Sequence, residues 1–161
     1  MAKVQSGGTP ATVALRRVGI PFTLHPYDHR DDAESFGAEA AAALQVPPGE
    51  IFKTLVADLG GELVVAVVPV AGRLDLKALA MTLGAKKAAL ADPAAAARSS
   101  GYVVGGISPL GQRTPLRTVV DASAQALESM YVSAGRRGLQ LRLAPSDLVR
   151  ATGAHFAPIG S

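Results

Sequence analysis

The chain has 161 residues, of which 48% are apolar and 18% are charged, and it contains no cysteine and no tryptophan. These values predict a globular domain with a core of Val, Leu, Ile and Ala, and they exclude intrinsic disorder, disulfides, thiolate metal sites and a cysteine nucleophile of the protein. The formal net charge is a modest +3, and aromatic residues make up only 4% of the chain. So few aromatic residues argue against nucleic-acid recognition by successive base stacking.

Charged residues are distributed unevenly along the chain. Residues 1–50 hold four basic and six acidic residues, whereas residues 72–98 and 113–150 together hold eleven basic and five acidic ones. A surface that is positive on one side attracts a polyanion weakly and non-specifically. The pattern fits either an ordinary solvated surface or a weak nucleic-acid footprint that a partner must strengthen.

Helical and strand-like segments alternate in the first half of the chain. Residues 1–8 are expected to form a flexible tail, and Thr9 followed by Pro10 is typical of an N-cap and a first helical position. The expected elements are a helix over 9–18, a strand over 21–27, a polar loop over 28–32, an Ala-rich helix over 37–44, and strands over 51–59 and 62–70. Gly60-Gly61 between the last two predicts a hairpin, and their nearly continuous apolar character predicts that both faces are covered.

The second half adds shorter segments of both kinds. We expect helices over 75–83, 92–98 and 145–152, a glycine-punctuated segment over 101–111, and strands over 117–121, 130–133 and 139–143. Because the strands outnumber those of a βαβ repeat and include hairpins, the sequence predicts an α+β fold. Its sheet should be mixed and crumpled, curled or barrel-like, with helices packed around it, in one domain over residues 9–158.

Membrane insertion, export and three kinds of catalytic site are disfavoured by the sequence. The longest apolar stretch, Leu63 to Ala71, is too short to span a bilayer, and MAKVQSGGTP lacks the apolar run of a signal peptide, so a cytoplasmic location is expected. His25 and His29 are separated by Pro26, which removes the helical geometry of a metal site. Ser108 is followed by proline and lacks a nucleophile elbow, and no glycine-rich segment has the form of a P-loop.

Lys53 and two glycine clusters remain as candidates for chemistry. Lys53 lies in a strand otherwise built for burial, so it either reaches solvent or points into a cavity, where its cation could stabilise an oxyanion. The glycines of 105–111 would permit close approach of a ligand to backbone N–H groups, or simply form a tight turn. The cluster over 133–138 is interpreted as a turn whose basic pair, Arg136 and Arg137, faces solvent.

Successive short motifs resemble the YbaK/EbsC family of aminoacyl-tRNA editing proteins, in particular its free-standing cysteinyl-tRNA(Pro) deacylases. They include HPYDH at 25–29, FKTL at 52–55, PVAG at 69–72, LGAKK at 83–87, ADP at 91–93, GYVVGGISPLGQ at 101–112 and YVS at 131–133. The similarity runs from about Thr9 to Phe156 and therefore covers nearly the whole chain.

The resemblance implies a fold, a site and partners. The fold would be the YbaK type, the one associated with prolyl-tRNA synthetase, with Lys53 as the key catalytic residue and no metal or cofactor. Substrate-binding positions implied by the resemblance are Tyr27, Phe36, Thr54, Gly105, Gly106, Ile107 and Ser133. The implied substrate is mischarged Cys-tRNA(Pro), bound by its acceptor end in a transient complex with prolyl-tRNA synthetase.

One position departs from the family pattern. The cysteine-specific members carry an acidic residue where this chain has Gln140. The preferred amino acid can therefore differ, since pocket size discriminates by only about 1–3 kcal/mol per methylene. Two alternatives stay open: a deacylase for another small aminoacyl-tRNA such as Ala-tRNA(Pro), and a non-catalytic module that binds tRNA or a synthetase.

Overall fold

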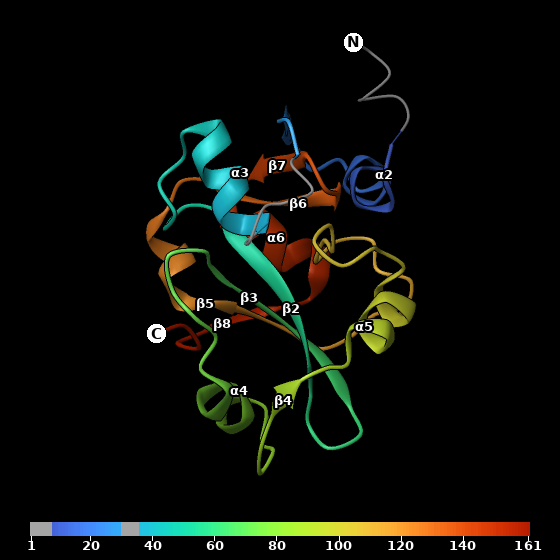
Figure 1. The fold of residues 1–161 in the computed structure, drawn as a ribbon, viewed down its shortest axis with the longest axis vertical. Helices are drawn as coiled ribbons and strands as arrows, with labels where there is room; N and C mark the ends of the chain where they lie inside the picture. Colours follow the sequence, from blue (N-terminus) through green and yellow to red (C-terminus); the bar gives the residue numbers. More distant parts are fainter. Residues whose placement is uncertain (1–7, 30–35) are drawn as a thin grey trace.

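The computed structural model describes residues 8–29 and 36–161, so the expected tail over 1–8, apart from its last residue, and residues 30–32 of the expected polar loop lie outside it. Within these residues the chain forms an α+β fold of helices around two sheets (Figure 1). The helices are α2 (Pro10–Arg17), α3 (Phe36–Leu44), α4 (Leu76–Thr82), α5 (Pro93–Ser100), the 3-10 helix η1 (Ala122–Ala126) and α6 (Pro145–Thr152).

Eight strands make up the two sheets. They are β1 (Thr23–Pro26), β2 (Phe52–Asp58), β3 (Leu63–Pro69), β4 (Ala89–Leu90), β5 (Thr118–Asp121), β6 (Met130–Arg136), β7 (Leu139–Leu143) and β8 (His155–Ala157). One sheet has the order β1-β7-β6 and is antiparallel, whereas the other has the order β4-β2-β3-β5-β8 and is mixed. The expected mixed α+β architecture is confirmed, but in the described part of the chain the strands form two sheets and not a closed barrel.

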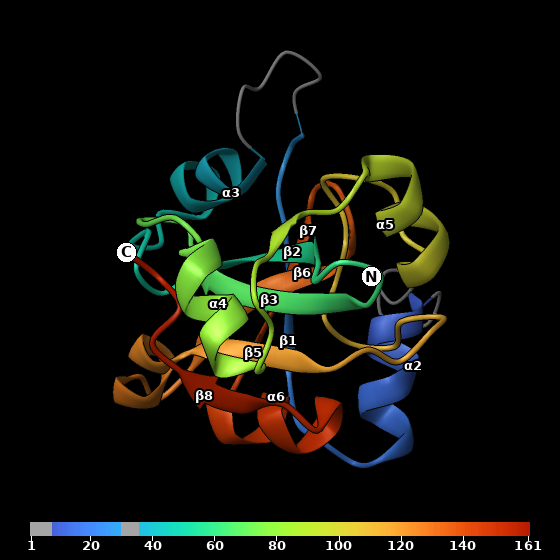
Figure 2. The ribbon, with the colours of Figure 1, turned by 90° about the horizontal axis from the view of Figure 1, so that it is seen from below.

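Within the described residues, one β-bridge joins the two sheets. Ile51, just before β2, pairs with Tyr131 of β6, and the Tyr131 N–H donates to the Glu50 carbonyl at 2.9 Å. Figure 2 shows β2 close to β6, in agreement with this bridge. The start of β2 therefore lies where both sheets meet.

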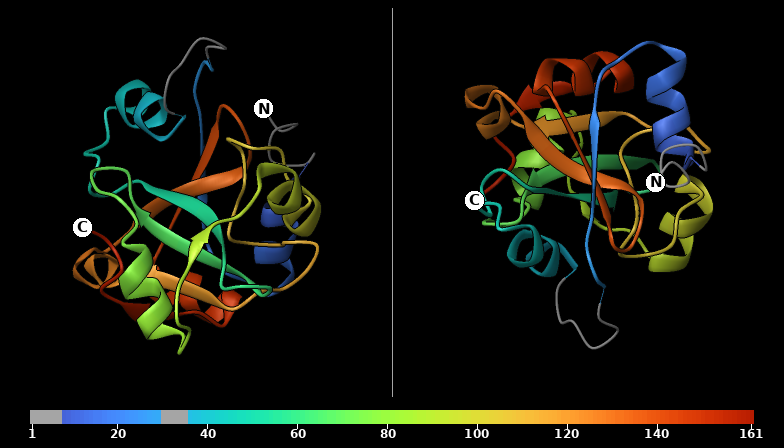
Figure 3. Two further views of the ribbon diagram at one scale, coloured as in Figure 1. Left: turned by 60° about the horizontal axis from the view of Figure 1, so that its bottom comes forward. Right: turned by 90° about the horizontal axis from the view of Figure 1, so that it is seen from above.

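The main core fills the space between the sheets. Val65 and Val67 of β3 share one apolar cluster with Val132 of β6 and Leu141 of β7, and Leu15 of α2 closes one side. The right-hand view of Figure 3 shows α2 and α3 on different sides of the three-stranded sheet. Burial of such aliphatic side chains contributes about 1.5–3 kcal/mol each, which explains how a chain poor in aromatic residues forms its core.

A second cluster covers the outer face of the five-stranded sheet. Val64, Ala66 and Val68 alternate with the β3 residues of the main core, and they pack against Leu79 of α4 and Ile159. Both faces of β3 are therefore buried, as its continuous apolar run predicts. In β2, by contrast, Lys53, Thr54 and Leu55 are only partly buried, so the expectation of two covered faces was wrong for this stretch.

Local sequence signals explain most of the boundaries. The Thr9 hydroxyl caps α2, Asp75 and Asp92 cap α4 and α5 through the N–H groups of Ala78 and Ala95, and Pro93 occupies a first helical position. In the β2–β3 hairpin, Asp58 Oδ1 accepts hydrogen bonds from Gly60 N–H at 2.8 Å and Gly61 N–H at 2.7 Å. These caps and turns satisfy backbone donors that the ends of the elements leave unpaired.

Candidate active site

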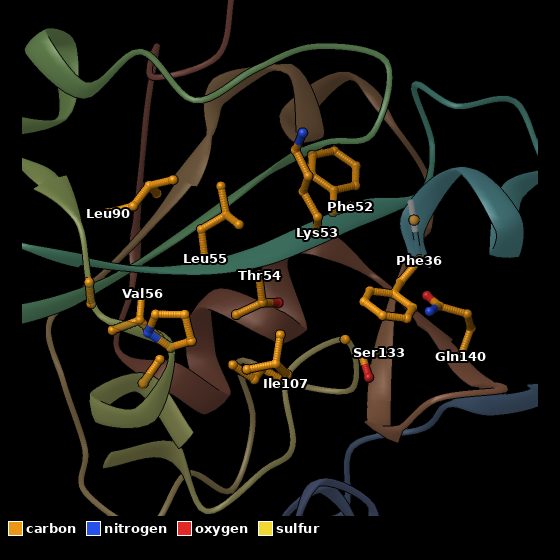
Figure 4. Close-up of a pocket in the computed structure, with 16 residues that line it drawn as sticks. Phe36, Phe52, Lys53, Thr54, Leu55, Val56, Leu90, Ile107, Ser133 and Gln140 are labelled. Atoms are coloured by element: carbon orange, nitrogen blue, oxygen red, sulfur yellow. The ribbon is translucent and has the colours of Figure 1, made fainter. Parts of the chain in front are cut away.

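A pocket of about 430 Å³ lies where the two sheets, α3 and the segment before β5 come together. Its walls come from Phe36 and Gly37 at the start of α3, from residues 52–56 of β2, and from residues 90–96 around β4 and α5. The segment after α5 contributes Val104, Gly105 and Ile107, and the three-stranded sheet contributes Ser133 and Gln140 (Figure 4). The pocket thus unites segments that are more than 100 residues apart in sequence.

The backbone edge of β2 is open where it meets the pocket. The Leu59 N–H donates a hydrogen bond to the Glu62 carbonyl, and the Ile51 carbonyl accepts one from Val70 N–H. The backbone groups of the odd-numbered residues of β2 are therefore hydrogen-bonded to β3. The backbone N–H and C=O groups of the even-numbered residues are then directed at the opposite edge of β2. There the Val56 carbonyl accepts a hydrogen bond from Ala91 N–H at 2.9 Å. Among the described strands only β4 pairs with this edge, at residues 57–58, so the backbone N–H and C=O of Thr54 are directed at the pocket.

Lys53 lines the pocket on one side of this edge. Its ammonium Nζ donates a hydrogen bond to the Gly72 carbonyl at 3.1 Å, and Figure 4 shows it pointing away from Ile107 and Ser133. Burial lowers the pKa of Lys53 from its ordinary value, and the charge of Arg73 lowers it further. The strand alternation places Thr54 on the opposite side, toward Ile107 (Figure 4). A ligand in contact with both must therefore lie across the edge of β2.

The glycine segment approaches the three-stranded sheet closely. A Cβ at Gly106 would lie 2.8 Å from the Arg136 Cα, so only glycine fits at this approach. Gly106 is buried and donates its N–H to the Val103 carbonyl at 2.9 Å, and it does not line the pocket. Gly105 does line it, with φ at +89° and, within the described residues, with an N–H that donates no hydrogen bond. Such an N–H is available to a carbonyl oxygen of a ligand.

Phe36 forms another part of the pocket wall, and Arg137 holds its ring in place. The guanidinium carbon of Arg137 lies 4.6 Å from the centroid of the Phe36 ring, and its Nε and Nη2 donate to the Val104 carbonyl at 2.9 and 2.6 Å. Both arginines are exposed, as expected, but Arg137 also contacts Val104 and Phe36, which the sequence did not predict. Nothing in the local sequence distinguishes Arg137 from Arg136; only the approach of residues 104–105 to the β6–β7 turn does.

Ser133 and Gln140 face each other across β6 and β7. They are register partners, and Figure 4 shows Gln140 beside Phe36. Gln140 is only 7% exposed, and its Oε1 is buried without a hydrogen-bond partner among the described residues. The Ser133 hydroxyl accepts from Gly135 N–H at 3.1 Å. A buried carbonyl oxygen without a donor is costly, so Gln140 presents an acceptor ready for a ligand.

Tyr27 lies behind Gln140 and outside the pocket lining. It packs with Ala40, Ala41 and Ile51, and its N–H donates to the Gly138 carbonyl at 2.9 Å. Burial raises the pKa of Tyr27, and hydrogen bonds with the Gly138 backbone and then with the Gln140 side chain partly offset that rise. Of the expected site residues, the structure brings Lys53, Phe36, Thr54, Gly105, Ile107 and Ser133 into the pocket wall, and it leaves Tyr27 and Gly106 just behind it.

His25 and His29, which are not expected to bind a metal, contact other side chains. His25 Nε2 lies 2.7 Å from the Thr23 hydroxyl, and its ring packs edge-on against Tyr131. His29 Nδ1 lies 2.9 Å from a Glu39 carboxylate oxygen. Over residues 8–29 and 36–161, no group of three His, Cys, Asp or Glu side chains has the arrangement of a metal site.

None of the helices in these ranges has both the length and the apolar character that a bilayer span requires.

Comparison with known proteins identifies the family of the chain. The model of the aminoacyl-tRNA editing domain matches residues 31–151. The EbsC protein of Enterococcus faecalis (strain ATCC 700802 / V583), named for deacylation of Cys-tRNA(Pro) and Cys-tRNA(Cys), is 38% identical over 153 residues, or 92% of each protein.

Solved structures share the fold over nearly the same length. A hypothetical protein designated APE2540 superposes with a TM-score of 0.84 at 28% identity, covering 95% of this chain and all of its own. A protein described as a trans-editing enzyme for prolyl tRNA synthetase superposes with a TM-score of 0.83 at 24% identity, covering 94% and 95% of the two chains. The chain belongs to the aminoacyl-tRNA editing domain family and is an aminoacyl-tRNA deacylase of the YbaK/EbsC type.

Proposed function

We propose that this deacylase hydrolyses mischarged Cys-tRNA(Pro) in the cytoplasm, by placing the aminoacyl ester across the open edge of β2. One observation carries the proposal: among the described residues, Lys53 is the one ionisable side chain that lines the pocket. These lining residues offer no carboxylate, imidazole or thiol, and of their side chains only the Lys53 amine and the Thr54 and Ser133 hydroxyls could attack an ester. An aminoacyl ester is already reactive, so a nucleophile from the substrate or from water is sufficient.

The substrate thiol can serve as that nucleophile. The sulfur of the cysteinyl group attacks its own ester carbonyl, the bond to the ribose oxygen breaks, and the thiol proton ends on the ribose hydroxyl. The products are free tRNA and a cyclic cysteine thioester, which water then opens to cysteine. The protein contributes position and charge, and correct placement of two reacting groups alone can supply several kcal/mol of the barrier.

The described groups divide this task among them. The free N–H of Gly105 faces the carbonyl oxygen as negative charge develops on it. Gln140 Oε1 accepts a hydrogen bond from the substrate amine, and the open edge at Thr54 supplies a backbone donor and acceptor. Lys53 anchors the substrate electrostatically, because one of its three N–H groups is bound to Gly72 and the other two remain available.

A deacylase for a different small aminoacyl-tRNA, such as Ala-tRNA(Pro), is the second candidate. It is favoured by Gln140, which stands where the cysteine-specific members of the family carry an acidic residue. Alanine has no thiol, so its release would need a water molecule held at the same carbonyl. The two candidates differ in substrate and not in the residues they use.

The decisive experiment compares Cys-tRNA(Pro), Ala-tRNA(Pro) and Pro-tRNA(Pro) as substrates of the wild-type protein and of Lys53→Ala. We expect rapid loss of cysteine from the wild type and a kcat/KM about 10- to 100-fold lower for Lys53→Ala, because a hydrogen bond from a charged group contributes about 1.5–3 kcal/mol. Lys77→Ala is the matched control, because Lys77 is an exposed lysine on α4. Its rate should equal that of the wild type.

The other outcomes decide against particular parts of the proposal. Loss of alanine but not cysteine would replace the thiol mechanism by the second candidate. Full activity of Lys53→Ala would remove Lys53 from the mechanism. If no ester is cleaved while tRNA still binds, the chain is a non-catalytic tRNA-binding module.

A further inference from the structure

Three segments of the chain meet at the side chain of Arg137. The residue sits in the turn between β6 and β7, and it reaches both the Val104 carbonyl and the ring of Phe36, the first residue of α3. Two donors of one guanidinium converge on a single oxygen, which fixes the plane of the group. That plane in turn lies against the Phe36 ring, so one side chain joins two walls of the pocket.

The packing around this contact leaves no spare room. A Cβ at Gly105 would lie 2.7 Å from Phe36 Cδ2 and 2.8 Å from Arg137 Nε. Gly105 therefore fits between the ring and the guanidinium only because it has no side chain. A shift of the Arg137 side chain would free both the ring and the backbone of Gly105 to move.

We propose that Arg137 is a positioning residue that sets the place of Phe36 and of the Gly105 N–H, and thereby determines which aminoacyl group the pocket accepts. The inference rests on the proposed deacylation, because it assigns Arg137 a role in that same pocket. Arg137 does not itself line the pocket, so it acts through the two residues that do. Loss of its contacts should widen the pocket at Phe36 and misplace the donor at Gly105.

Lysine cannot replace arginine in this role. It has no planar fork that can direct two N–H groups at one carbonyl, and it stacks less well on an aromatic ring. A role in positioning therefore predicts that Arg137→Lys behaves like Arg137→Ala. A role that depends on charge alone, such as holding a substrate phosphate, predicts that Arg137→Lys behaves like the wild type.

Arg136 provides the matched control. It is the adjacent arginine, it is exposed, and its side chain forms no hydrogen bond or ion pair within the described residues. Arg136→Ala removes the same formal charge from the same turn without touching Phe36 or Val104. Thermal unfolding of all three variants ensures that they are compared as folded proteins.

The first measurement does not depend on activity. In ¹H–¹⁵N spectra of the isolated protein, Arg137→Ala and Arg137→Lys should shift or broaden the amide signal of Gly105, whereas Arg136→Ala should leave it unchanged. An unchanged Gly105 signal in both Arg137 variants would overturn the proposal. This result would stand even if the wild type hydrolysed none of the aminoacyl-tRNAs, which would be a failure of the proposed function and not of the positioning role.

The second measurement is kinetic and uses the preferred aminoacyl-tRNA beside Pro-tRNA(Pro). We expect Arg137→Ala to lower kcat about tenfold with KM within about twofold, and to lose about tenfold in discrimination against proline, since displaced groups cost rate more than binding. Arg136→Ala should retain the kcat of the wild type. A raised KM with unchanged kcat in Arg137→Ala, or full rescue by Arg137→Lys, would show a charge contact to the substrate and overturn the positioning role.

Discussion

Gln140 is the residue that we expect to recognise the amine of the substrate. It is buried at 7% exposure between Ser133, Phe36 and Tyr27, and its Oε1 has no donor within the described residues. A carboxylate at this position would place a negative charge in a pocket whose one ionisable lining residue is Lys53. The amide keeps the acceptor and omits the charge, so an ammonium group is recognised by hydrogen bonding more than by charge.

Replacing Gln140 tests this at the residue scale. Gln140→Leu should raise KM for the aminoacyl-tRNA about two- to tenfold, because it removes an acceptor worth roughly 0.5–1.5 kcal/mol. Gln140→Glu should lower KM, since an ionised acceptor bonds an amine about twice as strongly. Steady-state kinetics on the preferred substrate measure both. Equal KM values in all three proteins would show that the amine is bound elsewhere.

Asp121 ties the end of β5 to the C-terminal segment. Its Oδ1 accepts from Ile159 N–H at 3.0 Å and Gly160 N–H at 2.8 Å, and its Oδ2 accepts from the N–H and hydroxyl of Ser123 at the start of η1. Burial acts to raise the pKa of Asp121, but these hydrogen bonds outweigh it and the pKa is lowered overall. One carboxylate therefore joins two elements to the outer face of the five-stranded sheet.

The lowered pKa predicts how this element responds to acid. A carboxyl whose pKa is lower in the folded than in the unfolded state stabilises the protein above the unfolded value, and the stabilisation disappears as the pH falls through the folded value. Asp121→Asn should lower the free energy of unfolding by about 1–3 kcal/mol at pH 7. The difference in the free energy of unfolding between the wild type and Asp121→Asn should shrink as the pH falls below 3.8, the ordinary pKa of aspartate. Urea unfolding from pH 7 to pH 3 measures this.

Asp147→Asn serves as the control for that series. Asp147 pairs at 2.8 Å with the exposed Arg150 on α6, and exposed pairs of this kind contribute little to stability. Its stability should equal that of the wild type throughout. A deficit of Asp121→Asn that stays constant down to pH 3 would contradict the assigned titration.

At the scale of the whole molecule, the modest charge argues for a partner. The net charge is +3, and the basic residues are concentrated beyond residue 72, on segments that include the α4–β4 connection and the β6–β7 turn. A protein that neutralises few phosphates binds RNA weakly, and its affinity falls with salt. We propose that prolyl-tRNA synthetase supplies the missing affinity in a transient complex on the tRNA.

Sedimentation velocity tests this proposal. The protein should co-sediment with tRNA(Pro) and prolyl-tRNA synthetase together, but only weakly with either alone, at about 150 mM salt where exposed charges are screened beyond ~8 Å. Raising the salt further should dissociate the complex. Equal sedimentation of the protein with and without the two partners would contradict it, and a non-cognate tRNA controls for simple charge attraction.

Local patterns and the family resemblance predicted much of this molecule. Thr9-Pro10, Asp92-Pro93 and Gly60-Gly61 mark caps and a turn that the structure contains, because capping and turn formation depend on residues close in sequence. The resemblance identified six residues of the pocket wall. The two short strands β4 and β8 escaped prediction, since two or three residues carry no periodicity and become strands only beside a longer neighbour.

The sequence by itself determined the fold class, the family and the absence of a catalytic cysteine in the protein, because these follow from composition, periodicity and ordered motifs. Only the tertiary structure decided that β2 has an open edge, that Arg137 and not Arg136 supports the pocket, and that Gln140 is buried with a free acceptor. Each of these depends on which distant segments come together. Burial and hydrogen bonding at a site are properties of neighbours in space, and no local pattern encodes them.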